Sequence, residues 1–146
     1  MKKFVYTIAF IFASLTAVTA QEWQTNFDTA KEIAISQDRP IILVFQGSDW
    51  CAHCIKLDRE VFSTDTFKTF AKEHYVMLKA DFPKRKKNAL SEEQQKLNNG
   101  LAEKYNKRGI FPLVVVLDKN GTVLGETGYF KASPSQYIAH IEEIKG

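Results

Sequence analysis

The chain contains few of the residues that a metal-binding protein needs. Among its 146 residues there are two cysteines and three histidines. A structural zinc ion takes four ligands, usually from two such pairs, so we expect no metal site. We also expect no bound cofactor. The sequence shows no internal repeat and no low-complexity segment, which favours one folded unit over a repeat array.

A strong excess of charge of one sign is also absent. Lysine and arginine number 20 against 17 acidic residues, a formal net charge of +3. Such a chain lacks the basic excess typical of proteins that bind nucleic acid, so nucleic acid is not expected as a partner. One local exception is the basic run Lys84 to Lys87. It is interpreted either as a solvated loop or as a docking surface for an acidic partner, and the sequence leaves both open.

The one long apolar run lies at the N-terminus. Lys2 and Lys3 precede an almost wholly apolar run over 4–15, and small residues stand before Gln21. This pattern is typical of a secretory signal peptide cleaved near Ala20. A membrane anchor is the weaker interpretation, because the run is short for a bilayer span and no cysteine follows it to carry a lipid.

Two segments are therefore predicted, a signal peptide at 1–20 and a single domain at 21–146. About 126 residues suit one domain with a respectable core. Loss of the two N-terminal lysines would leave a formal charge of +1. We predict that the protein is periplasmic or secreted after cleavage.

The two cysteines stand two residues apart, in Trp50-Cys51-Ala52-His53-Cys54. This spacing places the second sulfur one helical turn behind the first, within reach of a disulfide bond. If Cys51 lies at a helix N-terminus, the helix dipole and free backbone N–H groups stabilise its thiolate. Outside the cytosol such a pair can be purely structural, but so short a loop constrains the unfolded chain very little. We therefore interpret the pair as a reversible dithiol.

Hydrophobic patterning predicts an α/β chain. Helices are expected over 22–37, 55–62, 66–74, 91–105 and from 133 onward, and strands over 41–45, 75–80, 113–117 and 122–126. The run from Asp118 to Gly121 predicts a hairpin turn. Residues 63–65, Ser91 and Ser133 are expected to cap helices. This order of elements predicts a mixed central sheet with helices on both faces.

Four features occur in a fixed order along the chain. They are the strand ending in Phe45, the motif from Trp50 to Cys54, Gly109-Ile110-Phe111-Pro112 before a strand, and the 118–121 hairpin. With them the chain resembles the thioredoxin superfamily from about residue 22 to the C-terminus. It is similar in particular to exported thioredoxin-like and disulfide isomerase-like proteins of bacteria. The resemblance implies a thioredoxin fold with an N-terminal helix and an insertion before the cis-proline strand.

The resemblance also implies roles for individual residues. Cys51 would be the exposed nucleophile that forms a mixed disulfide with a protein substrate, and Cys54 the buried thiol that resolves it. Pro112 would follow a cis peptide bond, with the backbone beside it pairing with the substrate. Phe111 would be an apolar contact for the bound peptide or, alternatively, a core aromatic. Trp50 is expected to shield the sulfur and touch the substrate, although a core position is also open.

The direction of electron flow is the open question. His53 can donate a hydrogen bond to the Cys51 thiolate, which would stabilise the reduced form and raise the reduction potential. The family positions that carry a buried acid and a lysine hold Phe45 and Met77 here, and we expect these two residues to lie together beneath the cysteines. Both features favour an exported oxidase or isomerase of protein disulfides.

Two alternatives remain. The likeness to small exported proteins leaves open a reductase fed by a membrane electron donor. The second alternative is a thioredoxin-fold module that binds client proteins without catalysis. The expected partners are proteins with disulfides or thiols and a second dithiol protein, for which the inner membrane is one location.

Overall fold

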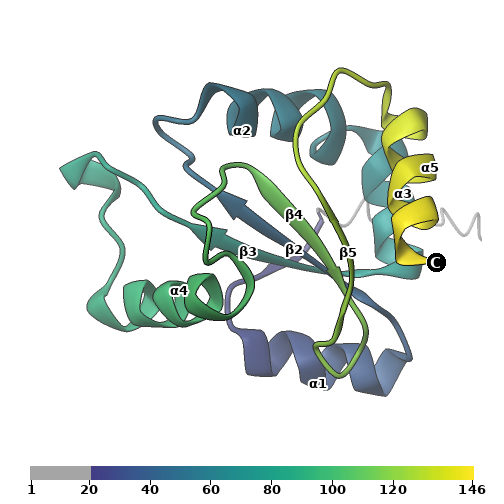
Figure 1. Ribbon diagram of the computed structural model, residues 1–146, viewed down its shortest axis with the longest axis horizontal. Helices are drawn as coiled ribbons and strands as arrows, with labels where there is room; N and C mark the ends of the chain where they lie inside the picture. Colours follow the sequence, from purple (N-terminus) through teal and green to yellow (C-terminus); the bar gives the residue numbers. More distant parts are fainter. Residues whose placement is uncertain (1–20) are drawn as a thin grey trace, which may run out of the picture.

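Five strands form a single mixed sheet within residues 21–146, the part of the chain that the computed structural model describes (Figure 1). The predicted signal peptide lies outside the described residues. The strand order is β1 (Trp23–Gln24), β3 (Val76–Asp81), β2 (Ile41–Gln46), β4 (Leu113–Leu117) and β5 (Val123–Thr127). The first three run parallel, and β4 and β5 are antiparallel to their neighbours. The mixed sheet predicted from the sequence is confirmed.

Helices cover both faces of the sheet, as predicted. One face carries α1 (Phe27–Gln37) and α4 (Glu92–Tyr105). The other carries α2 (Ala52–Leu57), its π-helical continuation η1 (Asp58–Phe62), α3 (Asp65–His74) and α5 (Pro134–Lys145). A short 3-10 turn, η2 (Lys86–Asn88), projects from the sheet between β3 and α4 (Figure 1). None of the helices within 21–146 is long and apolar enough to cross a bilayer.

The central strand β2 is buried on both faces. Its side chains alternate between the two hydrophobic cores, with Ile42 and Val44 on the α2 side and Leu43 and Phe45 on the α1 side. Such alternation follows from the two-residue period of a strand. Because helices cover both faces of the sheet, the sequence of this strand is an uninterrupted apolar run.

The same alternation corrects one interpretation of the sequence. Phe45 and Met77 do not lie together beneath the cysteines, because they belong to the cores on opposite faces of the sheet. The residue paired with Phe45 on β3 is Ala80. Neither position carries a charge, so the absence of the family's buried acid at residue 45 still holds.

The first helix starts later than predicted. The sequence pattern predicted a helix from residue 22, but Trp23 and Gln24 instead extend the sheet by pairing with β3. The side chain of Asn26 then caps α1 by accepting hydrogen bonds from the backbone N–H groups of Asp28 and Thr29, at 2.9 and 3.1 Å. Trp23 and Gln24 thus form a short strand on the open edge of β3 and do not continue the helix toward the N-terminus.

Three of the other predicted helix starts are confirmed to within one residue, and the helix predicted over 55–62 begins three residues earlier, at Ala52. Thr64, Ser91 and Ser133 each accept a hydrogen bond from a backbone N–H in the first turn of α3, α4 and α5, respectively. The predicted turn at 118–121 is also present. Asp118 accepts from the N–H groups of Asn120 and Thr122, and Gly121 has a positive φ of 88°.

We predict that Gly121→Ala destabilises the fold. A Cβ at this position would lie 2.9 Å from the Phe27 ring and 3.0 Å from the Tyr105 hydroxyl oxygen, in a backbone conformation that alanine avoids. The free energy of unfolding, measured by urea titration, should fall by about 1–3 kcal/mol. Gly100→Ala is the matched control, because a Cβ there meets nothing within 4 Å. It lies inside α4 and should raise stability by up to about 1 kcal/mol, and equal losses in both variants would contradict the prediction.

Candidate active site

The two cysteines form a disulfide at the start of α2. Cys51 is the N-cap residue of this helix, as predicted, and its Cα lies 5.2 Å from that of Cys54. The Cys51 Sγ also accepts a hydrogen bond from the Cys54 backbone N–H at 3.2 Å. The sulfur of Cys51 is therefore placed where helix N–H groups stabilise negative charge.

The expectation that Cys51 is the exposed cysteine is wrong for this disulfide form. Cys51 is 7 % exposed and Cys54 5 %, so the two residues are almost equally buried. The reason is local: the Cys51 sulfur is bonded to Cys54 and directed at the first turn of its own helix. Burial alone does not distinguish the nucleophile from the resolving thiol in this form.

The peptide bond between Phe111 and Pro112 is cis, as the resemblance implied. Pro112 is buried, and β4 begins at the next residue, beside the end of β2. Phe111 is half-buried, with its ring centroid 5.5 Å from the rings of both Trp50 and Phe82. It also packs against the core on the α1 side, so its exposed part alone is available to a bound peptide.

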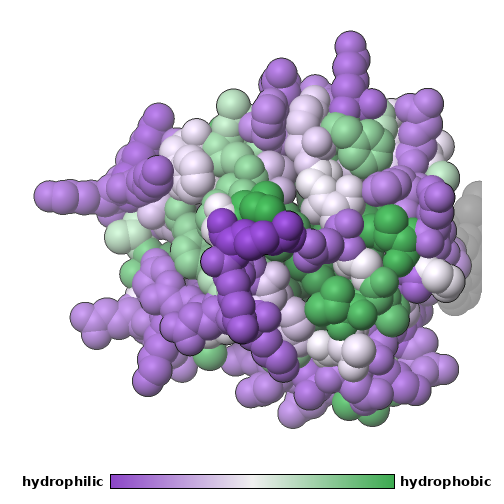
Figure 2. Space-filling model, in the orientation of Figure 1, coloured by the Kyte–Doolittle hydropathy of each residue, from purple (hydrophilic) through white to green (hydrophobic). Residues whose placement is uncertain are grey.

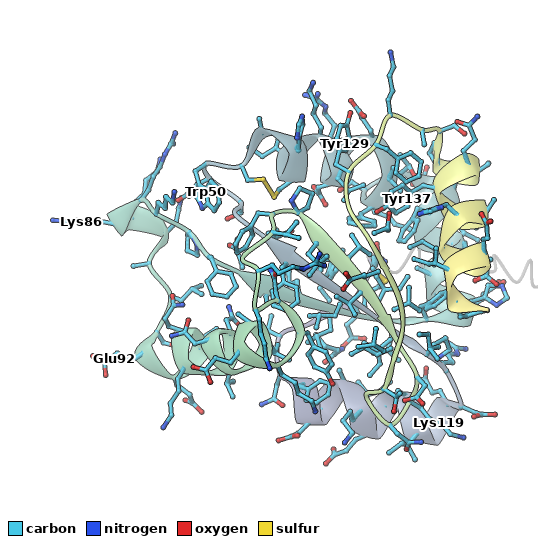
Figure 3. The ribbon with its side chains drawn as sticks, in the orientation of Figure 1. Trp50, Lys86, Glu92, Lys119, Tyr129 and Tyr137 are labelled. Atoms are coloured by element: carbon cyan, nitrogen blue, oxygen red, sulfur yellow. A yellow bond between two sulfur atoms is a disulfide. The ribbon has the colours of Figure 1, made fainter. Side chains whose placement is uncertain are left out.

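Trp50 lies at the rim of the disulfide and is 38 % exposed (Figure 3). Its indole Nε1 donates a hydrogen bond of 2.7 Å to the backbone carbonyl of Phe82. The ring lies so close to Gly47 that a Cβ there would be 2.2 Å from it. Glycine at position 47 thus lets the indole lie flat against the turn that follows β2.

The turn between β2 and α2 also holds the segment that follows β3. The Asp49 carboxylate accepts hydrogen bonds from the backbone N–H groups of Lys84 and Arg85 and from Asn88 Nδ2, at 2.9, 3.0 and 2.9 Å. The hydrogen bonds from Lys84 and Asn88 lower the pKa of Asp49 to about 2, with a smaller contribution from Arg85. Ser48 donates to the carboxylate of Asp81, from its backbone N–H at 2.9 Å and from its hydroxyl at 2.6 Å.

His53 is exposed and stacks on Tyr129, with ring centroids 4.9 Å apart and planes 17° apart. The Tyr129 hydroxyl donates to Glu60 Oε2 at 3.1 Å. Partial burial and this carboxylate raise the pKa of Tyr129. Within residues 21–146 no hydrogen bond joins His53 to either sulfur. Donation from His53 to a Cys51 thiolate therefore remains a prediction for the reduced form.

The structure brings all the predicted site residues to one end of the sheet. Cys51, His53 and Cys54 come from α2, Trp50 from the preceding turn, and Phe111 and Pro112 from the loop before β4 (Figure 3). Sequence analysis missed Asp49 and Tyr129, because their partners lie far away along the chain. No group of three or more metal-ligating side chains occurs in the described part of the chain.

Comparison with known proteins gives consistent matches. Residues 22–119 match the family model described as Thioredoxin-like. The disulfide bond reductase DsbH of Chlamydia pneumoniae is 34 % identical over 121 residues, covering 83 % of this chain and 70 % of that protein. The solved DsbH oxidoreductase structure has a TM-score of 0.79 at 31 % identity, over 87 % of this chain and 85 % of that one.

A more distant structure has the same fold. The disulphide isomerase from Xylella fastidiosa Temecula1 is 20 % identical, with a TM-score of 0.58 over 79 % of this chain and 87 % of that one. At this identity the match shows the fold alone.

We predict that Asp49→Asn loosens the segment after β3. The folded pKa of about 2 lies below the ordinary 3.8, so the carboxylate stabilises the fold above pH 3.8 and loses this effect as the pH falls toward 2. The variant should be less stable than the wild type near pH 7, and the difference in unfolding free energy should shrink toward pH 2. Trypsin should also cleave the variant faster after residues 84–87.

Glu103→Gln, on the exposed side of α4, is the charge-matched control. It should leave the rate of tryptic cleavage at 84–87 unchanged. A stability difference between Asp49→Asn and the wild type that stays constant from neutral pH to pH 2 would contradict this role of the carboxylate.

Proposed function

This chain belongs to the thioredoxin-like family and is a thiol–disulfide oxidoreductase of thioredoxin fold, and on that premise we propose that it reduces protein disulfides outside the cytosol. The observation that carries the direction is the similarity to a disulfide bond reductase, at 34 % identity over most of both chains. The Cys51–Cys54 pair at a helix N-terminus, beside a cis-proline loop, is the site at which the exchange takes place.

The proposed reaction uses the reduced form of the dithiol. The Cys51 thiolate attacks one sulfur of the client disulfide, forming a mixed disulfide and releasing the other client sulfur as a thiolate. Cys54 then attacks the Cys51 sulfur, which breaks the mixed disulfide and frees the second client thiolate. The client gains two electrons and, from water, two protons, and the Cys51–Cys54 disulfide is restored.

Client binding is proposed at the apolar rim of the disulfide. Trp50 and Ile110 are 38 % and 37 % exposed, although they are large and apolar. Phe111 and the cis Pro112 complete this rim from the loop before β4. An extended client segment would pair with the backbone beside Pro112 while its disulfide lies against Cys51.

Regeneration of the dithiol requires a second dithiol protein as the electron donor, and we place that donor in the inner membrane. The N-terminal pattern of residues 1–20 supports export of the domain formed by 21–146. Outside the cytosol thiols are not kept reduced by the cytosolic pool, so an exported reductase depends on a dedicated source of electrons.

Oxidation or isomerisation is the second candidate, and His53 is the observation that favours it. It lies between the two cysteines in sequence, two residues after Cys51, and an imidazole that donates to the Cys51 thiolate would stabilise it and make the protein a better oxidant. At the position of the family's buried acid the chain has Phe45, which is fully buried and pairs with Ala80. Cys54 therefore loses its proton without help from a carboxylate at that position.

We predict that Cys51→Ser abolishes reduction of insulin, with turnover falling to the rate without protein. The serine oxygen does not form the mixed disulfide, so no electrons pass. Cys54→Ser should instead trap the mixed disulfide with the client, visible as a covalent adduct on a non-reducing gel. Undiminished turnover in Cys51→Ser would overturn the enzymatic role and favour a binding module.

We predict an equilibrium reduction potential below about −230 mV, nearer to thioredoxin at about −270 mV than to the oxidant DsbA at about −120 mV. His53→Ala should lower it by about 30 mV for each 1.4 kcal/mol of thiolate stabilisation that the imidazole supplies. The measurement is equilibration against glutathione of known potential. A wild-type value above about −180 mV would favour the oxidase or isomerase instead.

A further inference from the structure

We propose that the basic segment, residues 84–87, binds an acidic stretch of the client protein next to the disulfide that is being reduced. The proposal rests on the proposed function, because it concerns the substrates of the same site. Of the two sequence interpretations of this segment, a solvated loop and a docking surface, the structure favours the second.

The basic segment is fixed to the active-site turn. Asp49, two residues before Cys51, binds its backbone at Lys84 and Arg85. The Lys84 ammonium lies 3.9 Å from the centre of the Trp50 ring, in a cation–π contact. One aromatic side chain thus connects the cations with the rim of the disulfide. Figure 3 shows Lys86 beyond Trp50, on the side away from the disulfide.

The cations of the basic segment are exposed and lack acidic side-chain partners. All four residues are exposed, and within residues 21–146 no carboxylate lies within 4.0 Å of their charged groups. The Asp49 carboxylate, on which the charge of Arg85 also acts, accepts hydrogen bonds from backbone N–H groups and from Asn88. Figure 2 shows hydrophilic side chains extending from this edge.

The four positive charges of the basic segment exceed the net charge of the whole domain. Residues 21–146 carry a formal charge of +1, so the part outside the basic segment carries −3. Four positive charges are therefore concentrated beside the active site of an otherwise acidic domain. Such a local field attracts acidic partners and repels basic ones.

A hollow of about 480 Å³ lies between the basic segment and the first half of α4. Its wall includes Lys84, Arg85, Lys86 and Lys96, against the single acidic residue Glu92. Ala89 and Leu90 add an apolar part to the lining. Side chains of a short acidic peptide therefore find cations on several sides and an apolar surface for their carbon chains. The chemistry of the hollow fits an acidic peptide segment.

The proposed contact acts on encounter with the client and leaves the exchange of sulfurs unchanged. Binding of a flanking acidic segment raises kcat/KM, chiefly through KM and the association rate, and the effect weakens as salt screens the charges. The chemical step at Cys51 is common to all clients.

The test uses two disulfide peptides of equal length and sequence, apart from four flanking positions that are aspartate or glutamate in one and asparagine or glutamine in the other. At low salt the wild type should reduce the acidic peptide with a kcat/KM at least about threefold higher. Lys86→Gln/Lys87→Gln should lose this preference while reducing the neutral peptide as the wild type does. At about 1 M salt, where the Debye length is about 3 Å, the preference should vanish in the wild type as well.

The matched control is Lys104→Gln/Lys107→Gln, which removes the same charge from two exposed positions, one in the last turn of α4 and one just after this helix. It should keep the preference, and an equal loss in both double variants would assign the effect to overall charge and overturn the proposal. Equal kcat/KM for the two peptides in the wild type would also overturn it, while leaving the reductase function standing.

A second measurement separates the two proposals. A cysteine-free acidic peptide is titrated into the disulfide form by calorimetry, where no reduction takes place. Binding that is weakened by Lys86→Gln/Lys87→Gln and kept in the control supports the docking surface even if disulfide reduction fails. Absence of binding to the wild type would sink the docking surface and leave the reductase proposal intact.

Discussion

The central strand β2 is the constraint on which the active end of the molecule depends. It is buried on both faces and is paired on both sides, with β3 through Gln46 and Asp81 and with β4 through Phe45 and Leu113. Its register therefore brings three chain segments to one end of the sheet: the turn that carries Cys51, the segment after β3, and the loop with the cis Pro112. A one-residue slip would exchange the two faces of the strand, which the two apolar cores forbid.

The turn after β2 connects the reacting sulfurs with their surroundings. Its polar side chains, Ser48 and Asp49, bind the end of β3 and the segment beyond it, while Trp50 lies across Gly47 and binds the carbonyl of Phe82. Because these residues immediately precede Cys51, the disulfide and the basic segment are positioned by one set of hydrogen bonds. The proposed client-docking segment and the proposed site of disulfide exchange thus share one set of hydrogen bonds.

On the side of the disulfide opposite to Trp50, the contacts come from His53, Tyr129 and Glu60. His53 stacks on Tyr129, which is bound in turn to Glu60, so aromatic and hydrogen-bonding contacts restrain the imidazole. At the position where the resemblance implies a buried acid the chain has Phe45, which lies on the α1 side of the sheet and pairs with Ala80. The Cys51 sulfur lies at a helix N-terminus and both cysteines are nearly buried, and both features act on the stability of a thiolate there.

Features that depend on residues a few positions apart could be predicted from the amino-acid sequence. The strand at 41–45, the cap at Thr64, the turn at 118–121 and the dithiol spacing were all predicted, because their hydrogen bonds and periodicity are local. The resemblance added the cis Pro112. Three features depend on long-range contacts and were not predicted: Trp23 joins the sheet, Cys51 is as buried as Cys54, and Phe45 and Met77 face opposite cores.

The contacts of Asp49 and His53 were likewise decided by the tertiary structure alone. Asp49 binds residues 35 and 36 positions away, and His53 stacks on a ring contributed by the loop after β5. No short-range pattern encodes such pairs, because they form only when the register of β2 brings distant loops to the same end of the sheet.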